Sequence, residues 1–276
     1  MNSRSHQRSG TPISALSRRR LLELGGLGLT AATLGACATH ATEDALPTSQ
    51  SASNTPTRSL QPEVPPTPQS NPPVVPTAVE SQPMVQICRE AWGAAPARPG
   101  GRPHTISRMT LHHTATVLGD NRYAPDRLRQ HQQYHQGDRG WIDIAYHVGI
   151  DRNGNIYELR APELAGDTAT DYDPAGHFLV LCEGNFDEES VTEAQLDGAA
   201  KAFAWAAQNF NLTSDLLGGH RDFASTACPG ENLCAHITSG DLHARIETLL
   251  AAGPIDLQRL CGEEAAARIA AIEAGQ

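Results

Sequence analysis

A histidine and a cysteine lie eight residues apart in the segment GGHRDFASTACPGEN, residues 218–232. Imidazole and thiolate groups both bind zinc, and a catalytic zinc typically takes three protein ligands and keeps a fourth position for water. The segment is too rich in Gly, Ser, Thr and Pro to form one regular element. His220 and Cys228 are therefore two candidate ligands on a loop, and a third ligand must come from elsewhere in the chain.

The best source of a third ligand is the segment LHHT, residues 111–114. His112 and His113 lie at the end of an expected strand, where neighbouring side chains point to opposite faces, so only one of them can join the loop ligands. Two neutral imidazoles and one thiolate would leave Zn²⁺ with a net charge of roughly +1, enough to acidify a bound water towards a pKa of about 7 and to polarise a carbonyl group.

The absence of a second cysteine at two-residue spacing from Cys228 disfavours a closed structural zinc site. The alternative for the pair is that His220 caps a loop and Cys228 is packed or disulfide-bonded. His131 and His135 could also bind metal at helical spacing, but no HExxH glutamate accompanies them, so an exposed polar helix face is the preferred interpretation.

The elements that would position these residues can be read from the apolar pattern. Alternating apolar residues over 106–111 predict a strand that ends near His112. Pro125 at the start of 124–136, followed by good helix formers, predicts a helix of about three turns.

A hairpin is predicted around residues 153–154, because Asn-Gly between two β-type runs is a strong turn signal. Alternation along the first run places Tyr146 on the same face as Ile144 and Val148, with His147 on the other face.

The second half of the chain continues the alternation of strands and helices. The apolar run 177–186 predicts a strand buried on both faces, and 192–210 predicts an amphipathic helix with a capping box. A short strand is expected at Leu216 and Leu217, and two Ala-rich helices at 241–251 and 263–273. This order predicts an α/β fold with a central mixed sheet flanked by helices.

The N-terminal 37 residues have the order of an export signal. They carry five arginines and one acidic residue, a net charge of +4. Because the whole chain has a net charge of −10, the remaining residues have a net charge of −14. The arginine cluster before an apolar run resembles a twin-arginine signal, and LGAC resembles a bacterial lipobox, which implies cleavage before Cys37 and lipid attachment to its sulfur. The alternative is an ordinary signal peptide with an incidental cysteine.

Three regions follow from this composition. Residues 1–37 are the predicted signal, and residues 38–83 are a Pro/Ser/Thr-rich linker that cannot bury enough apolar surface to fold. Residues 84–276 form the predicted folded domain with a C-terminal helical extension. This part is acidic and has one lysine, Lys201, which disfavours a nucleic-acid partner. A monomer is expected.

The chain resembles the peptidoglycan recognition protein and type 2 N-acetylmuramoyl-L-alanine amidase family over about residues 87–250. The resemblance rests on five segments in the same order, namely ICREAWGA, LHHTAT, WIDIAYHVGIDRNGNIYE, EGNF and GGHRDFASTACPG. It implies Zn²⁺ in a surface groove of that fold, with His112, His220 and Cys228 as ligands. Tyr146 matches the catalytic tyrosine, and Thr226 matches a position where members carry Lys or Thr.

The resemblance implies an exported zinc amidase at the bacterial cell envelope, with peptidoglycan as its partner and substrate. Tyr146 would donate to the oxyanion, a contribution of about 3 kcal/mol, and Thr226 would hold water or substrate. The alternative structural roles are a core aromatic for Tyr146 and a turn cap for Thr226. His113 and His147 are interpreted as packed residues and not as metal ligands. A binding module without activity, or an amidase acting on another amide, remain the functional alternatives.

Two features limit what the family pattern can supply. Asp167 falls where many members carry a groove histidine, so the resemblance does not supply the contacts to the stem peptide. The acidic run Asp167, Asp171 and Asp173 would suit an amine-bearing peptide such as one with diaminopimelate, but a solvated loop is the preferred interpretation. Four cysteines beyond Cys37 and Cys228 allow three disulfide pairings. A bridge between Cys88 and Cys261 would join the domain's ends, and Cys182 would be a packed thiol; the fourth is Cys234.

Overall fold

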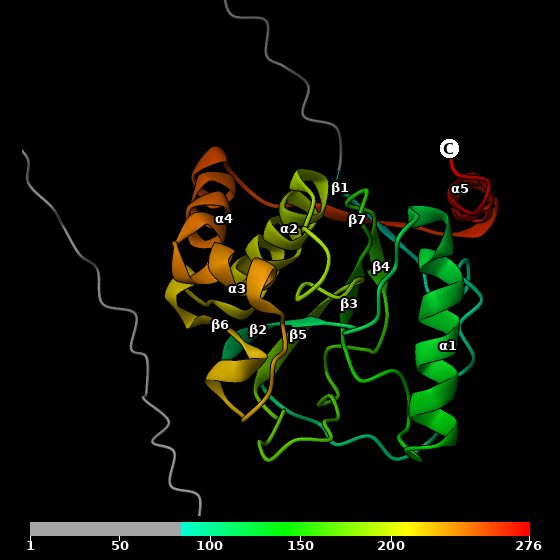
Figure 1. The fold of residues 1–276 in the computed structure, drawn as a ribbon, viewed down its shortest axis with the longest axis horizontal. Helices are drawn as coiled ribbons and strands as arrows, with labels where there is room; N and C mark the ends of the chain where they lie inside the picture. The colour runs from blue at the N-terminus through cyan, green and yellow to red at the C-terminus, as the bar shows by residue number, and fades with distance from the viewer. Residues whose placement is uncertain (1–83) are drawn as a thin grey trace, which may run out of the picture. The chain divides into compact units, whose positions relative to one another are not determined.

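The computed structural model describes residues 84–276, which form a seven-stranded mixed sheet with helices on both faces (Figure 1). The strands are β1 (Met84–Ile87), β2 (Arg108–His113), β3 (Val148–Ile150), β4 (Ile156–Glu158), β5 (His177–Cys182), β6 (Leu217–Gly219) and β7 (Leu257–Leu260). Their order across the sheet is β6-β2-β5-β3-β4-β1-β7. Every neighbouring pair is parallel except β3 and β4. The predicted α/β fold with a central mixed sheet is confirmed.

The helices are α1 (Ala124–Gly137), α2 (Glu193–Phe210), α3 (Glu231–Thr238), α4 (Asp241–Ala252) and α5 (Gly262–Glu273). Short 3-10 turns occur at η1 (Asn121–Tyr123), η2 (Ser214–Leu216) and η3 (His220–Asp222). Thr192 caps α2 as its sequence predicts, because its side chain accepts the backbone N–H of Gln195. Gly154 has a φ of +78° in the β3–β4 hairpin, as an Asn-Gly turn requires.

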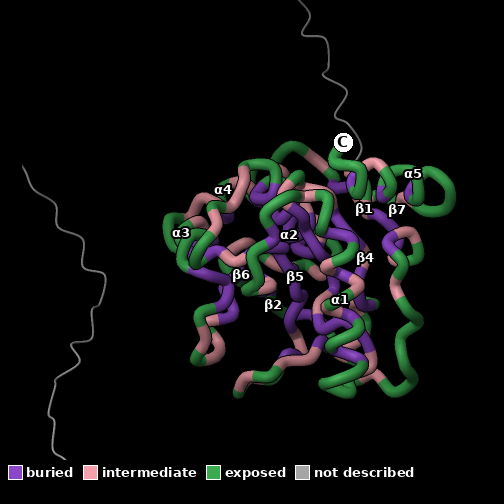
Figure 2. Tube along the Cα trace, turned by 45° about the vertical axis from the view of Figure 1, so that its right-hand side comes forward, coloured by how far each residue is buried: buried purple, intermediate pink, exposed green. Residues whose placement is uncertain are grey.

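Apolar side chains fill both faces of the sheet, in two separate clusters. One cluster joins β2 and β5 to the Ala-rich face of α2 and to α3 and α4, and Figure 2 shows the buried stretches of α2 over the strands. The other joins Trp92 and Tyr157 to Leu128 of α1 and Ile269 of α5. β5 is buried at all six positions, as the continuous apolar run predicts for a central strand covered on both faces.

The C-terminal segment completes the sheet and braces α1. β7 pairs in parallel with β1, and Cys261 forms a disulfide with Cys88. Arg129 of α1 donates to Glu273 of α5 at 2.9 Å. The bridge between Cys88 and Cys261 is therefore present, while Cys182, Cys228 and Cys234 are free thiols. Strands β1 and β7 and helix α3 had no clear signal in the sequence.

The predicted export signal, its Cys37 and the 38–83 linker lie outside the described residues. Within residues 84–276, no helix combines the length and apolar character that crossing a bilayer requires.

Candidate active site

Two of the predicted ligands converge because their strands are parallel neighbours. β2 pairs with β6, and Leu111 lies opposite Gly219 in the register. His112 and His220 follow these two residues directly, so both imidazoles emerge at the carboxyl ends of adjacent strands. This edge of an α/β sheet is the usual place for ligand sites.

The two glycines of β6 let the cysteine-bearing loop fold back over the strand. A Cβ on Gly219 would lie 2.9 Å from Cδ of Pro229, and one on Gly218 would lie 3.0 Å from the carboxylate of Asp222. The backbone N–H of Arg221 donates to the carbonyl of Cys228 at 2.9 Å, which closes the loop. Cys228 is thereby returned to the edge of β6.

His112, His220 and Cys228 offer ligand atoms that all lie within 4.8 Å of one another. Sγ of Cys228 lies 3.6 Å from Nδ1 of His112. Tetrahedral zinc with its usual Zn–S and Zn–N distances separates sulfur from nitrogen by about 3.6 Å. The two histidines and the cysteine are 2 %, 7 % and 9 % exposed, so the cluster is desolvated on its protein side. Both the chemistry and the spacing of this donor set fit a zinc ion.

Burial sets the protonation of these side chains. It lowers the pKa of His112 well below its ordinary value, with a further decrease from neighbouring His220, and it lowers the pKa of His220 as well. Burial also raises the pKa of the Cys228 thiol to about 12. Both imidazoles are therefore neutral, which is the form that binds metal, whereas the thiol would lose its proton to solvent only when a bound cation stabilises the thiolate.

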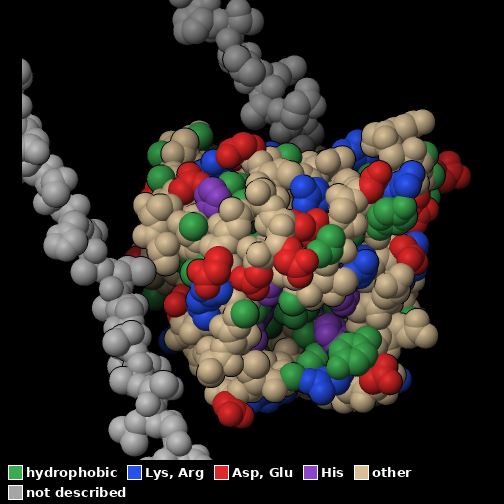
Figure 3. All heavy atoms as spheres, viewed as in Figure 1, with side chains coloured by type: hydrophobic (Ala, Val, Ile, Leu, Met, Phe, Trp, Pro, Cys, Tyr) green, Lys and Arg blue, Asp and Glu red, His purple; other side chains and the backbone are tan. Residues whose placement is uncertain are grey.

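The cluster opens into a groove with a cavity of about 440 Å³. Tyr146 and Thr226 line it together with Arg139, Trp141 and Asp187, of which the last three were not predicted. Figure 3 shows a hollow in the surface between α1 and the segment that leads into α3, with histidine side chains in and beside it. The end of the sheet at which the cluster lies is thus accessible from solvent.

Tyr146 lies beside the cluster, although not in a strand. Its ring centroid is 5.1 Å from that of His112. β3 begins only at Val148. Tyr146 packs with Ile144 in the apolar cluster that includes α1 and α5, whereas Val148 belongs to the cluster on the other face of the sheet. The predicted placement of Tyr146 on the same face as Val148 was therefore wrong. Desolvation raises the pKa of Tyr146, which keeps its hydroxyl protonated and able to donate.

Comparison with known proteins identifies the family of this chain. The sequence profile of the N-acetylmuramoyl-L-alanine amidase family matches residues 102–231. Peptidoglycan-recognition protein SC2 of Drosophila melanogaster is 31% identical over 150 residues, covering 53% of this chain and 81% of that protein. The chain belongs to the peptidoglycan recognition protein and type 2 amidase family.

Other similar proteins are named as an amidase and as a recognition protein. N-acetylmuramoyl-L-alanine amidase of Homo sapiens is 33% identical over 155 residues, which cover 53% of this chain and 26% of the human protein. The structure of peptidoglycan recognition protein-LE in complex with tracheal cytotoxin, a monomeric diaminopimelic acid-type peptidoglycan, has a TM-score of 0.52 and 26% identity, covering 59% of this chain and 98% of that one.

The loop that carries Asp167 borders the groove. Asp167 forms an ion pair with buried Arg160 at 2.6 Å. Asp171 and Asp173 are exposed, as a solvated loop predicts, and Asp173 pairs with exposed Arg102. The hydroxyl oxygen of Thr170, in the same loop, lies 2.8 Å from Nε2 of His220. Nothing in the sequence pattern distinguished Thr170 from an ordinary loop threonine.

The remaining histidines that belong to the family motifs have structural partners. Nδ1 of His113 accepts from the N–H of Phe186 at 3.4 Å, and the N–H of His113 itself donates to Sγ of Cys228 at 3.4 Å. His147 accepts from the N–H of Leu179 at 2.9 Å and contacts the carbonyl of Leu164 at 3.0 Å. His113 is thus a packed neighbour of the ligand cluster, and His147 ties two segments together.

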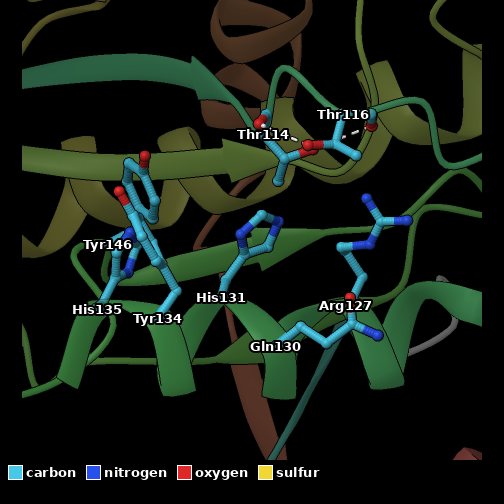
Figure 4. A pocket seen from close by; sticks show the side chains of 8 residues that line it. All are labelled: Thr114, Thr116, Arg127, Gln130, His131, Tyr134, His135 and Tyr146. Carbon is cyan, nitrogen blue, oxygen red and sulfur yellow. Dashed lines mark hydrogen bonds between the residues drawn. The ribbon is translucent and has the colours of Figure 1, made fainter. Parts of the chain in front are cut away.

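The expectation of an exposed face at His131 and His135 was wrong. His135 is 7 % exposed, and its Nδ1 accepts from the N–H of Ala145. Both histidines line a second cavity of about 430 Å³, which runs along α1 from Tyr146 to Arg127 (Figure 4). His131 and His135 therefore point into this cavity and do not form an exposed face of α1.

Proposed function

We propose that this protein is a zinc-dependent N-acetylmuramoyl-L-alanine amidase. It hydrolyses the amide between the lactyl group of N-acetylmuramic acid and L-alanine in peptidoglycan, releasing a carboxylate and an amine. The observation that carries the proposal is the convergence of His112, His220 and Cys228 within 4.8 Å beside Tyr146 in one groove. Similarity to the human amidase supports the amide chemistry, and similarity to a recognition protein with bound peptidoglycan supports the substrate class.

The proposed metal ligands are His112, His220 and Cys228, because their ligand atoms lie within 4.8 Å of one another and all three residues line the groove. When bound, the ion would polarise the scissile carbonyl and acidify a water molecule. His112 and His220 contribute neutral nitrogen donors, and Cys228 contributes a negative sulfur after its proton is released. A set of three protein ligands leaves the ion open towards the groove.

Tyr146 is the proposed catalytic donor. Its protonated hydroxyl lies beside the cluster and would donate a hydrogen bond to the carbonyl oxygen as negative charge develops there, a contribution of about 3 kcal/mol. Thr226 accepts the backbone N–H of Cys228 at 3.2 Å and lines the groove. We assign Thr226 to holding the ligand loop and a water or substrate group, because an alcohol is too weak an acid or base to transfer the proton.

The two cavities provide room for the peptide that follows the scissile bond. Thr114, Tyr134, His135 and Tyr146 line both of them, so the groove continues past Tyr146 along α1. Figure 4 shows His131 and Arg127 projecting from α1 towards the loop that holds Thr114 and Thr116. A glycan strand at the metal cluster would thus direct its peptide towards α1.

The proposed location is the bacterial cell envelope, with a lipid anchor at Cys37. Its support is the order of arginines, apolar residues and LGAC in residues 1–37. The disulfide between Cys88 and Cys261 is independent support, because such bonds form and persist in oxidising compartments outside the cytoplasm. The 38–83 linker would let the domain reach the wall.

Digestion of purified peptidoglycan tests the function. The protein with zinc should release muramic-acid lactyl carboxyls and free L-alanine amino termini in equal numbers, and chelator or Cys228→Ser should abolish both. Sedimentation of the same protein with insoluble walls separates the alternative. Binding to walls without new amino termini would identify a recognition module, and new termini other than alanine would identify an amidase for another bond.

A further inference from the structure

Of the two imidazoles in the proposed metal cluster, that of His220 is the one with a hydrogen-bond partner at Nε2. Its Nε2 lies 2.8 Å from Oγ1 of Thr170, a residue 50 positions away in the chain. Nε2 of His112, by contrast, is buried without a hydrogen-bond partner among residues 84–276. The orientation of one ligand therefore depends on a loop that is not part of the ligand motif.

The donor and acceptor roles in this contact are linked to a second threonine. Oγ1 of Thr170 lies 2.8 Å from Oγ1 of Thr168, and the backbone N–H of Thr170 donates to the same Thr168 oxygen at 3.1 Å. If Thr170 donates its hydroxyl hydrogen to Thr168, its oxygen accepts from Nε2–H of His220. This direction fixes the imidazole in the tautomer that is protonated at Nε2 and leaves the lone pair of Nδ1 free for a metal.

The loop that carries these threonines is fixed at several points. Asp167 is bound by Arg160, and Arg160 also donates to the carbonyl oxygens of Asp143 and Ala165. The ring of Tyr172 packs against His220 with 4.9 Å between centroids. Thr170 is therefore presented to His220 by a braced segment, as an orienting partner requires.

We propose that Thr170, supported by Thr168, is a positioning residue that holds His220 ready for metal binding. This inference rests on the proposed function, since it concerns the affinity of the same metal cluster. A ligand histidine usually donates its other ring N–H to an orienting group, and loss of that group costs 10–100-fold in metal affinity. In this chain the orienting group is a threonine of the loop that carries Asp167.

Zinc affinity and the imidazole tautomer test the proposal. Thr170→Val keeps the shape of the side chain and removes the hydroxyl, and Thr170→Ser restores the hydroxyl. Thr248→Val is the matched control, because the Thr248 hydroxyl bonds only to the carbonyl of Ala244 within α4. Zinc dissociation constants come from competition with a chromophoric chelator, and ¹⁵N chemical shifts of His220 in the metal-free protein report its tautomer.

The expected result is a loss of roughly 10–100-fold in zinc affinity for Thr170→Val, with a mixed tautomer, and less than about 3-fold for Thr170→Ser and Thr248→Val. Equal zinc affinity in the wild-type protein and Thr170→Val would overturn the role of Thr170 and leave the proposed function intact. A wild-type protein that binds no zinc would overturn both. Thermal unfolding curves of all variants verify that the fold is retained.

Discussion

The sulfur of Cys228 lies 3.6 Å from Nδ1 of His112, although 116 positions separate the two residues in the chain. Two separate devices produce this proximity: the parallel register of β2 and β6, which brings His220 beside His112, and the folded loop that returns the cysteine to β6. The proposed metal site therefore depends on the sheet as much as on the motif, and its parts can be tested one at a time.

Replacement of Cys228 by serine should weaken zinc binding by more than about 100-fold. A serine hydroxyl does not ionise as a thiol does, so the loss should exceed the 10–100-fold effect of an outer partner. A chelator competition titration measures it. Cys234→Ser is the matched control, because Cys234 is a free, largely buried thiol on α3 outside the cluster. Unchanged affinity in Cys228→Ser would remove the cysteine from the ligand set.

Replacement of Tyr146 by phenylalanine should reduce kcat by about 10²–10³-fold and leave zinc affinity unchanged. The variant removes one oxyanion donor, and losses of that size are typical for such donors. Turnover of a muramoyl-peptide substrate gives kcat, and chelator competition gives zinc affinity. Tyr123→Phe, at an exposed tyrosine of η1, controls for loss of a phenol elsewhere. A variant with wild-type kcat would return Tyr146 to a packing role.

Thr226→Val should weaken zinc binding several-fold, and Thr226→Ser should restore it. The hydroxyl of Thr226 accepts the N–H of Cys228, so its removal leaves that donor unpaired and loosens the ligand loop at a cost of about 1 kcal/mol. The same titration measures the effect. A large fall in kcat at unchanged zinc affinity would instead indicate direct contact between Thr226 and the reacting groups.

The stability of the protein should depend on pH through Glu183. Burial raises the pKa of this carboxyl to about 8. Nearby Arg127 opposes the increase, and Asp151 adds to it. His131 of α1 faces it at 3.8 Å. Because the folded state holds the proton more tightly than the unfolded state, this contribution is complete below about pH 4.5 and is lost as pH rises to about 8.

Glu183→Gln removes that titration. Between pH 5 and pH 8.5, the free energy of unfolding of the wild-type protein should therefore fall by roughly 3–5 kcal/mol more than that of the variant. Urea unfolding at both pH values measures the difference, and Glu188→Gln, at an exposed carboxyl, is the control. Parallel pH profiles for the wild-type protein and Glu183→Gln would show that Glu183 is ionised in the folded state.

Loss of the Cys88–Cys261 disulfide should lower the free energy of unfolding by about 2–5 kcal/mol. The bridge closes a loop with a sequence separation of 173, which restricts the unfolded chain, and long loops lie at the upper end of the usual range. The double variant Cys88→Ser/Cys261→Ser tests this in denaturant, with reductant as the second arm. Reductant should destabilise the wild-type protein alone, and equal stability of all samples would contradict the expectation.

The sequence predicted those parts that depend on local pattern. The strand that ends at His113, the capped helix after Thr192 and the Asn-Gly hairpin each have a short-range physical cause, and each is present. The joint pattern of five segments also led to the correct family. The strand, the capped helix and the hairpin could be predicted because neighbouring residues determine them, whereas the family came from motifs spread along the chain.

The parts that could not be predicted depend on tertiary neighbours. His131 and His135 look like a polar helix face, and only the cavity between α1 and the loop at Thr114 explains why they point inward. Thr170 meets His220 across 50 residues through a single hydroxyl, which leaves no periodic signal. β1 and β7 are four-residue strands at one side of the sheet, and their pairing with each other decides their conformation more than their own residues do.

The glycine pair that precedes His220 sets a condition for anyone who transplants this centre. A scaffold that copied the imidazoles and the thiol, but kept ordinary side chains at the positions of Gly218 and Gly219, would place a Cβ 3.0 Å from the Asp222 carboxylate and 2.9 Å from Pro229, and the returning loop would have to shift outward. The backbone that carries the thiol would then stand away from its partners. A minimal graft of this centre therefore includes two residues that have no side chain.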